Sequence, residues 1–378
     1  MPAQHQTKRQ LSMQPLENRN MFAGNVLAGL VGPDLTINGD AADNQFEVSE
    51  IAPNVVEVVG LSGTTINGLP SQTFSASLIE NIFVQTNDGH DEVIVKNLTL
   101  TDTPNGNLKI STSLGEDRVH LDRVFTTESI KVDTGDQNDV VDAVMTGTRG
   151  IWHTNSGDGL DSVHKHRVSA FNMKVETQGG DDQLTIVGAR IRNDLKVNTH
   201  NENDSVALDR VFAGNDILIR TEQGSDQVKL HRVRANNNVG LETGSESDVA
   251  HFSRVAARNN LFANMGTGDD RLAMDTVKSG VHLGVSTEDG NDRVTIVNAK
   301  SKDIHVDSGD DHDFVKMDNV NAVQDLHVLL GNGRDGLAIS NSSAANPFFD
   351  GGNDHDVLYN LPNAFALLPA SVNFETII

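Results

Sequence analysis

The chain has 378 residues, of which 53 are acidic and 29 are Lys or Arg, and its net charge is −24. This charge argues against nucleic acid and anionic lipid as partners and favours cations or basic surfaces. Without cysteine there is no disulfide framework or thiolate metal site, and no apolar run is long enough to cross a membrane.

Residues 1–34 differ from the rest of the chain and are predicted to be a leader or disordered tail. Their weakly apolar stretch is interrupted by Gly and Asn, which is unlike an ordinary signal peptide. The segment Leu16 to Gly24, LENRNMFAG, resembles the LExRxxxAG box that follows the leader in certain exported bacterial surface proteins. The resemblance implies export, so that the chain would be extracellular or at the bacterial cell surface.

Thirteen aspartates recur through the chain after this tail. After a first step of 26 residues, they are separated by 21 or 22 residues. A fixed period in this range means that one small unit is stacked many times, so the aspartates should form a row along one edge of a solenoid. They are Asp91, Asp117, Asp139, Asp161, Asp182, Asp204, Asp226, Asp248, Asp270, Asp292, Asp313, Asp335 and Asp356.

The residues around each aspartate define the repeating unit. The second residue after it is apolar in every repeat and the fourth in most, while a second alternating apolar pair lies nine and seven residues before the next aspartate. Alternation with period two and many β-branched residues predicts two short strands per repeat, with room for a third. We therefore predict an all-β fold, a right-handed parallel β-helix or β-roll with about 13 regular coils.

This reading divides the chain into four parts. The solenoid covers residues 78–360. Residues 35–77 are read as degenerate capping coils, in which Gly39 and Asp43 echo the aspartate turn, and residues 361–378 as a C-terminal cap. Caps are expected because an open solenoid end is an exposed sheet edge.

The best turn sequences carry a family resemblance. Ser156 to Asp161 (SGDGLD), Met265 to Asp270 (MGTGDD) and Leu330 to Asp335 (LGNGRD), each followed by x-apolar-x, resemble the GGxGxDxUx repeat of hemolysin-type (RTX) calcium-binding proteins. The resemblance implies calcium held between successive turns by backbone carbonyls and the aspartate. The coil here is longer than in that family, only one edge carries the motif, and many turns lack one of the two glycines.

The resemblance and the mutual repulsion of the stacked carboxylates together predict a calcium site along the later part of the row. Its members are the glycines of the three best turns and eight of the aspartates: Gly157, Gly159, Gly266, Gly268, Gly331, Gly333, Asp161, Asp182, Asp248, Asp270, Asp292, Asp313, Asp335 and Asp356.

Repulsion within the row of carboxylates points to a cation independently of the family resemblance. Two carboxylates about 4.8 Å apart repel by roughly 0.9 kcal/mol in water. Summed over a dozen pairs and halved by salt, this repulsion is still several kcal/mol, comparable with the stability of a domain. Calcium could offset it, with ligands added by acidic neighbours such as Asp158, Asp269 and Asp310. The alternative is an Asx-turn ladder, in which each carboxylate accepts backbone N–H groups without a metal.

Two further columns of side chains have structural interpretations. Thr86, Thr112, Thr134 and their equivalents lie five residues before an aspartate, which favours stacked, hydrogen-bonded threonines at a strand end. Lys109, Lys131, His153, Lys174 and Lys196 form an outward basic stripe that could grip an acidic glycan, although Asp133 and Glu176 are placed to pair with it.

The sequence therefore predicts an elongated structural, surface or adhesion module rather than an enzyme. No interval exceeds 26 residues, so no long loop is inserted between coils to build a cleft. Its expected partners are calcium ions and an extracellular glycan or another surface protein. A metal-independent scaffold and a carbohydrate-active β-helix enzyme are the alternatives.

Overall fold

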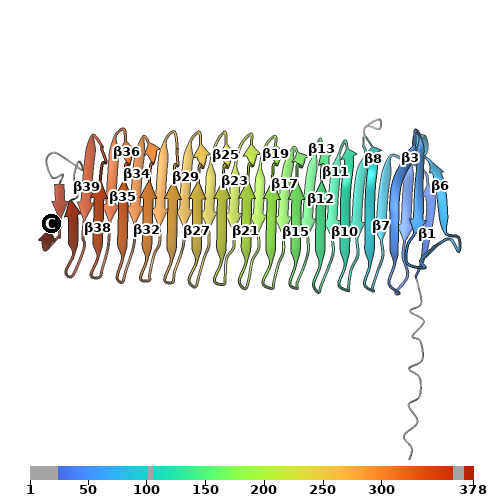
Figure 1. The fold of residues 1–378 in the computed structure, drawn as a ribbon, viewed down its shortest axis with the longest axis horizontal. Coiled ribbons are helices and arrows are strands. Elements are labelled where there is room, and N and C mark those ends of the chain that lie inside the picture. Colours follow the sequence, from blue (N-terminus) through green and yellow to red (C-terminus); the bar gives the residue numbers. More distant parts are fainter. Residues whose placement is uncertain (1–23, 101–104, 361–369) are drawn as a thin grey trace, which may run out of the picture.

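The computed structural model describes residues 24–100, 105–360 and 370–378, and within them the chain forms an elongated β-solenoid (Figure 1). One strand of a long-strand sheet begins directly after each of the thirteen aspartates. This sheet contains β8 (Glu92–Leu100), β10 (Arg118–Thr126), β12 (Val140–Val144), β15 (Ser162–His166), β18 (Gln183–Val187), β21 (Ser205–Asp209), β24 (Gln227–His231), β27 (Val249–Ser253), β30 (Arg271–Asp275), β32 (Arg293–Val297), β35 (Phe314–Asp318), β38 (Gly336–Ser340) and β40 (Val357–Asn360).

The second long face is a back sheet, which the chain reaches on its way to the next aspartate. It contains β7 (Asn81–Gln85), β9 (Asn107–Ser111), β11 (Ser129–Asp133), β14 (Ile151–Asn155), β17 (Asn172–Glu176), β20 (Leu195–Asn198), β23 (Ile217–Arg220), β26 (Val239–Glu242), β29 (Asn260–Asn264), β31 (His282–Ser286), β34 (Asp303–Asp307), β37 (Asp325–Leu329) and β39 (Asn346–Asp350).

A third row of short strands joins the two sheets, so the coil has three sides. In the first coils the second halves of β8 and β10 supply this side, because residues 125 and 126 of β10 pair with β13. The separate short strands are β13 (Gly147–Thr148), β16 (Ser169–Ala170), β19 (Arg190–Ile191), β22 (Phe212–Ala213), β25 (Arg234–Ala235), β28 (Ala256–Ala257), β33 (Lys300–Ser301) and β36 (Asn321–Ala322).

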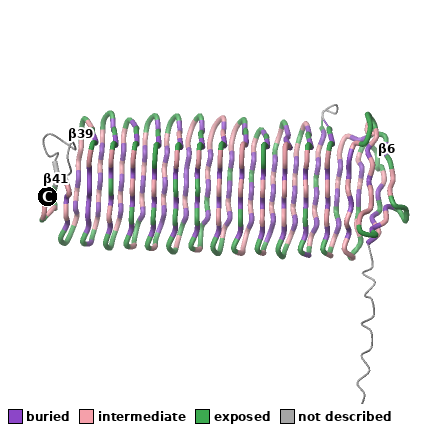
Figure 2. The backbone as a smooth tube through the Cα atoms, in the orientation of Figure 1, coloured by how far each residue is buried: buried purple, intermediate pink, exposed green. Residues whose placement is uncertain are grey.

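Successive coils are parallel and in register. Val119 pairs with Val141, and Val141 with Val163, which is a step of one repeat each time. Because side chains alternate across a strand, this register stacks each apolar column on itself inside the coil, as the alternating burial in Figure 2 shows. The predicted fold class, a parallel β-solenoid of about 13 coils, is confirmed.

A sharp bend separates each long strand from its short strand, and the sequence reading missed it. The residue six positions after each aspartate has a positive φ in every coil from Asn97 (φ 49) to Asn341 (φ 49). Five of these residues are arginines, including Arg232 (φ 53) and Arg254 (φ 59). Left-handed backbone is uncommon outside glycine, so the packing of the two sides imposes it.

The two ends are closed differently. At the N-terminus, β1 pairs antiparallel with β2, and β4 lies antiparallel between β3 and β6, which covers the first coil. This cap starts within the range predicted as a leader. At the C-terminus, β41 and β42 pair parallel with β39 and β40 and continue the coil. These elements are β1 (Asn25–Val31), β2 (Asp34–Asn38), β3 (Gln45–Ala52), β4 (Val55–Gly60), β5 (Thr65–Ile66), β6 (Ser71–Ser75), the 3-10 turn η1 (Ala76–Leu78), β41 (Ala370–Val372) and β42 (Thr376–Ile377).

Several sequence predictions fall outside the described residues. The surface-protein box lies there except for Gly24, as does most of the predicted leader and half of the C-terminal cap. In the described ranges, no helix has the length and apolar character needed to span a membrane.

Among the described residues, one lysine side chain is buried inside the apolar core. Lys165 of β15 is fully buried, in a column where its partner in the preceding coil is Ala143. Its Nζ donates to Thr154 Oγ1 at 2.8 Å and lies 4.4 Å from the ring centroid of Trp152, whose Nε1 donates to the same Oγ1. Burial lowers the pKa of Lys165 to about 7.

Candidate functional site

The thirteen aspartates form one continuous row, here called the aspartate ladder. The backbone N–H of each of the first twelve donates to Oδ1 of the aspartate in the next coil, with N to Oδ1 distances between 2.7 and 2.9 Å. All thirteen side chains are at most 4% exposed. The ladder therefore lies inside the turn edge, and it brings all eight predicted aspartate ligands into a single row.

The other carboxylate oxygen, Oδ2, is buried and accepts no hydrogen bond in any of the thirteen aspartates. A buried carboxylate that lacks a partner loses its hydration without compensation. This loss raises the pKa of every ladder carboxyl, to about 8 for Asp139, Asp204, Asp270 and Asp313, and to about 6 or about 7 for most of the others. Repulsion between neighbouring aspartates adds to the effect in several coils, including those of Asp204 and Asp270.

The threonine column lies beside this row, as predicted, but its hydrogen bonds go to the backbone. Thr112 Oγ1, for example, donates to the carbonyl of Thr134 in the next coil at 2.9 Å. In this orientation the hydroxyl does not bond to Asp117; turned towards that carboxyl instead, it would lower the pKa of Asp117 and oppose the effect of burial. Because one hydroxyl proton cannot serve both acceptors at once, either the carbonyl or the carboxyl is left without it.

The acidic neighbours that were expected to add ligands do not join the ladder. Asp158, Asp269 and Asp310 are exposed, on the outside of the turn. Asp269 instead accepts the backbone N–H and the side-chain amide of Asn291 in the next coil, each at 2.9 Å. Asp269 belongs to an outer column, one residue before the ladder aspartate, whose hydrogen bonds run in the opposite direction to those of the ladder.

The predicted glycines bring the turns of neighbouring coils into close contact. A Cβ on Gly266 would lie 1.7 Å from the carbonyl oxygen of Gly244, and one on Gly268 would lie 2.1 Å from that of Glu246. Both glycines also have positive φ. A side chain at either position would therefore clash with the neighbouring carbonyl and strain the backbone. The same holds for the glycine pairs Gly157 with Gly159 and Gly331 with Gly333.

A calcium ion at this edge would need backbone oxygens. Within the described ranges, no group of three or more His, Asp or Glu side chains is placed to hold a metal. Each coil offers one buried Oδ2 on the turn edge, where carboxylate and backbone carbonyl oxygens are hard ligands of the kind that calcium prefers. The oxygen donors fit calcium, but the carboxylates at any one position are too few to complete its coordination without backbone oxygens.

The ladder is closed at both ends by residues that the period did not reveal. Asn44 donates its backbone N–H to Asp91 Oδ1 at 2.7 Å, while Asp43, the predicted echo, accepts from His90 in the outer column. At the other end Glu375 Oε2 accepts the N–H of Asp356 at 2.7 Å. Glu375 follows Asp356 by only 19 residues, which is out of phase with the repeat.

The predicted basic stripe on the back sheet is largely paired. Lys131 Nζ lies 3.4 Å from Asp133, and Lys174 Nζ and His153 Nε2 lie 2.6 and 2.7 Å from Glu176. The two lysine ion pairs and the contact between His153 and Glu176 support the interpretation of the stripe as a solvated, compensated face.

Two substitutions at Asp270 are expected to separate the two functions of a ladder carboxyl. Asp270→Ala leaves the buried N–H of Asp248 without an acceptor and should lower the unfolding free energy by about 1–3 kcal/mol. Asp270→Asn keeps an oxygen for that N–H and removes the buried charge, so it should be at least as stable as the natural chain at pH 8. Urea unfolding in chelator measures both; equal losses in the two variants would contradict this assignment.

Comparison with known proteins gives no functional assignment: no protein family, curated protein or solved structure matches the chain.

Proposed function

We propose that this β-solenoid is an exported, non-enzymatic structural module of the bacterial cell surface or of an adhesive structure, and that calcium stabilises its aspartate ladder. One observation carries the proposal: each coil from Asp91 to Asp356 buries a carboxylate oxygen that accepts no hydrogen bond, and these oxygens recur coil after coil along one turn edge. The likeness of the turns at Asp161, Asp270 and Asp335 to RTX repeats supports calcium as the ion, and the LExRxxxAG-like segment supports export.

The mechanism would couple folding to the calcium concentration. Calcium held by the ladder carboxylates would offset both the desolvation and the mutual repulsion of these groups. Since bound ligand stabilises the folded state by mass action, the solenoid would be most stable outside a cell, where calcium is plentiful.

A metal-independent scaffold is the second candidate, and a specific observation favours it. The Oδ1 hydrogen bonds are complete along the whole ladder without any ion, and the raised pKa values would allow protons to neutralise part of the row.

Calcium titration at pH 8, followed by circular dichroism and thermal melting, distinguishes the two. The proposal expects the melting temperature to rise with calcium and not with equal magnesium, and the rise to be smaller in Asp270→Asn. A melting temperature that is the same in calcium and in chelator would leave only the scaffold.

A further inference from the structure

The short-strand side of the solenoid has an unusual charge distribution. In the twelve coils from Asp91 to Asp335, the five positions from six to ten residues after the aspartate hold 13 of the 29 Lys and Arg residues of the chain. They hold none of the 53 acidic residues. In a chain of net charge −24, this segregation makes the short-strand side a separate basic surface.

The cations of this surface, here called the basic strip, lie in three parallel columns. Six residues after the aspartate are Arg123, Arg167, Arg210, Arg232 and Arg254. Eight residues after it are Arg190, Arg234, Lys278 and Lys300. Ten residues after it are Arg149, Arg192, Arg258 and Lys302.

The basic strip is exposed and mostly lacks compensating carboxylates. All of its cations are exposed. Among the described residues, only Arg123, Arg210 and Lys302 of the strip form an ion pair, in each case with the acidic residue next to it in sequence. Of the stacked arginines Arg210, Arg232 and Arg254, only Arg210 is therefore compensated by a carboxylate.

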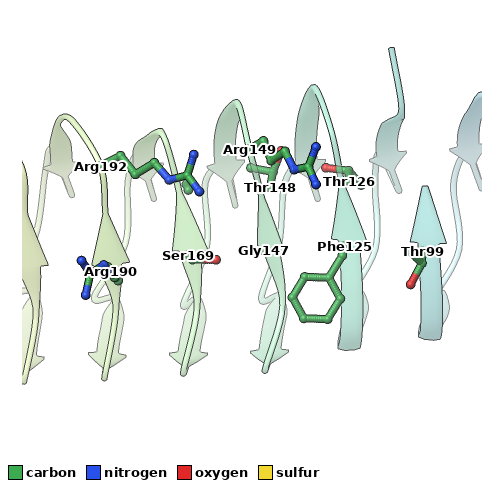
Figure 3. A pocket seen from close by; sticks show the side chains of 10 residues that line it. Thr99, Phe125, Thr126, Gly147, Thr148, Arg149, Ser169, Arg190 and Arg192 are labelled. Atoms are coloured by element: carbon green, nitrogen blue, oxygen red, sulfur yellow. The ribbon is translucent and has the colours of Figure 1, made fainter. Parts of the chain in front are cut away.

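The strip also contains hollows lined by its cations. The larger, of about 460 Å³, is lined by Arg149, Arg190 and Arg192 together with Phe125 and threonine and serine hydroxyls (Figure 3). It exists because Gly147 and Ser169 stand where other coils carry Phe or Arg. A second hollow of about 360 Å³ is lined by Arg234, Arg258 and Lys278.

We propose that the basic strip binds a linear acidic polysaccharide, laid along the solenoid axis. The strip runs over nine coils, which at about 4.8 Å per coil is roughly 40 Å. One sugar of an extended chain advances by about one coil, so a carboxylate or sulfate on each sugar or on alternate sugars could meet successive guanidinium groups, which bind such anions in bidentate fashion.

Charge and shape favour a polysaccharide over nucleic acid. The strip is narrow, since its short strands are two residues long, and the rest of the acidic chain would repel a broad polyanion such as a duplex. A single-stranded nucleic acid would need a continuous series of aromatic faces for stacking. The strip has Phe125, Phe171 and Phe212 only in alternate coils of its first part, and its segments from Arg232 to Lys302 contain no aromatic residue.

This inference gives the proposed surface module a partner and does not depend on calcium. Binding is therefore measured in chelator, where bridging of anions by calcium at the ladder edge cannot contribute. Failure of the calcium titration would then contradict only the proposed calcium site, and failure of the binding test would contradict only the proposed glycan site.

The test compares two triple variants of the full chain by biolayer interferometry on immobilised polygalacturonate and heparin, with dextran as the neutral probe. Arg149→Gln with Arg190→Gln and Arg192→Gln should weaken binding to at least one acidic probe by about ten-fold or more, and the remaining affinity should depend less on salt. The matched control, Lys109→Gln with Lys174→Gln and Lys196→Gln, changes the net charge equally and should weaken binding less than two-fold.

Three outcomes would overturn the proposal. They are absence of binding to both acidic probes at low salt, equal losses in the two variants, and binding of oligo(dT) that is tighter than that of either glycan and is lost in the arginine variant. Sedimentation of the natural chain adds a fourth: self-association that the arginine variant abolishes, without glycan binding, would identify a second copy as the occupant. Retained melting temperatures confirm that both variants are folded.

Discussion

In the presence of chelator, the melting temperature of this protein should fall by about 10 °C or more between pH 5 and pH 9. Burial without a partner for Oδ2 raises the pKa of the ladder carboxyls from 3.8 to about 6 to 8. A shift of three pKa units corresponds to roughly 4 kcal/mol for each carboxyl. Ionising even a few of them would consume a large part of the stability of a typical domain.

The sign follows from proton binding. A carboxyl whose pKa is higher in the folded state binds its proton more tightly there, so its contribution to stability is fully present below the unfolded pKa of about 4. That contribution is lost as the pH rises through about 6 to 8, the range of the folded values. This trend is opposite to that of a protein stabilised by surface salt bridges, in which depressed carboxyl pKa values make acid the destabilising condition.

A matched pair of variants tests whether the ladder causes the trend. Asp204→Asn with Asp270→Asn and Asp313→Asn removes three of the four carboxyls with the highest pKa and should flatten the profile. The same change at the exposed residues Asp136, Asp158 and Asp289 alters the net charge equally and should leave the slope in place. If both triple variants flatten the profile alike, general charge repulsion is responsible and the ladder is not.

Calcium should change this profile in a defined way. Protons and calcium compete for the same carboxyls, so the calcium-induced rise in melting temperature should be small at pH 5 and increase towards pH 9. A rise that is the same at both pH values would place any bound calcium away from the ladder.

The architecture could be predicted from sequence because it depends on repetition. The two-residue alternation around Asp270, with buried Leu272 and Met274 after it, recurs in most coils and fixes the inner face and the register. The short-strand side was harder to predict, because two-residue strands give no period and the bend before them is occupied by residues as different as Asn97, Arg232 and Thr276.

The row of aspartates was predictable, but its hydrogen bonding was not. Strand parity places Asp270 on the same inner face as Leu272, so its burial follows from the pattern once the turn is known to be tight. Its Oδ1 accepts the N–H of Asp248 in the preceding coil, and not an N–H of its own turn. This choice depends on the direction of the backbone N–H groups, which the side-chain pattern does not reveal. The residues that close the ladder, Asn44 and Glu375, could not be found from the repeat either. They belong to the caps, which do not follow the 21- or 22-residue spacing.

Lys165 breaks the apolar pattern of the core, and its replacement should have a large effect. Lys165→Met is expected to raise the unfolding free energy by about 2–4 kcal/mol at pH 7. The ammonium is fully buried, and among the described residues it has no carboxylate partner, only Thr154 Oγ1 and the face of Trp152. Methionine has a similar volume and leaves Thr154 hydrogen-bonded to Trp152.

The pH dependence of this gain distinguishes it from the effect of the ladder. Because burial lowers the pKa of Lys165 from 10.5 to about 7, the folded state binds its proton less tightly than the unfolded state does. The penalty is therefore full below about pH 7 and disappears as the pH rises towards 10.5. The difference in stability between the variant and the natural chain, measured by urea unfolding, should shrink between pH 7 and pH 10.

Lys229→Met, on the exposed face of β24, removes the same charge and should change stability by less than about 0.5 kcal/mol throughout. A loss of stability in Lys165→Met that is independent of pH would mean that the contacts with Thr154 and Trp152 outweigh the cost of burying the amine.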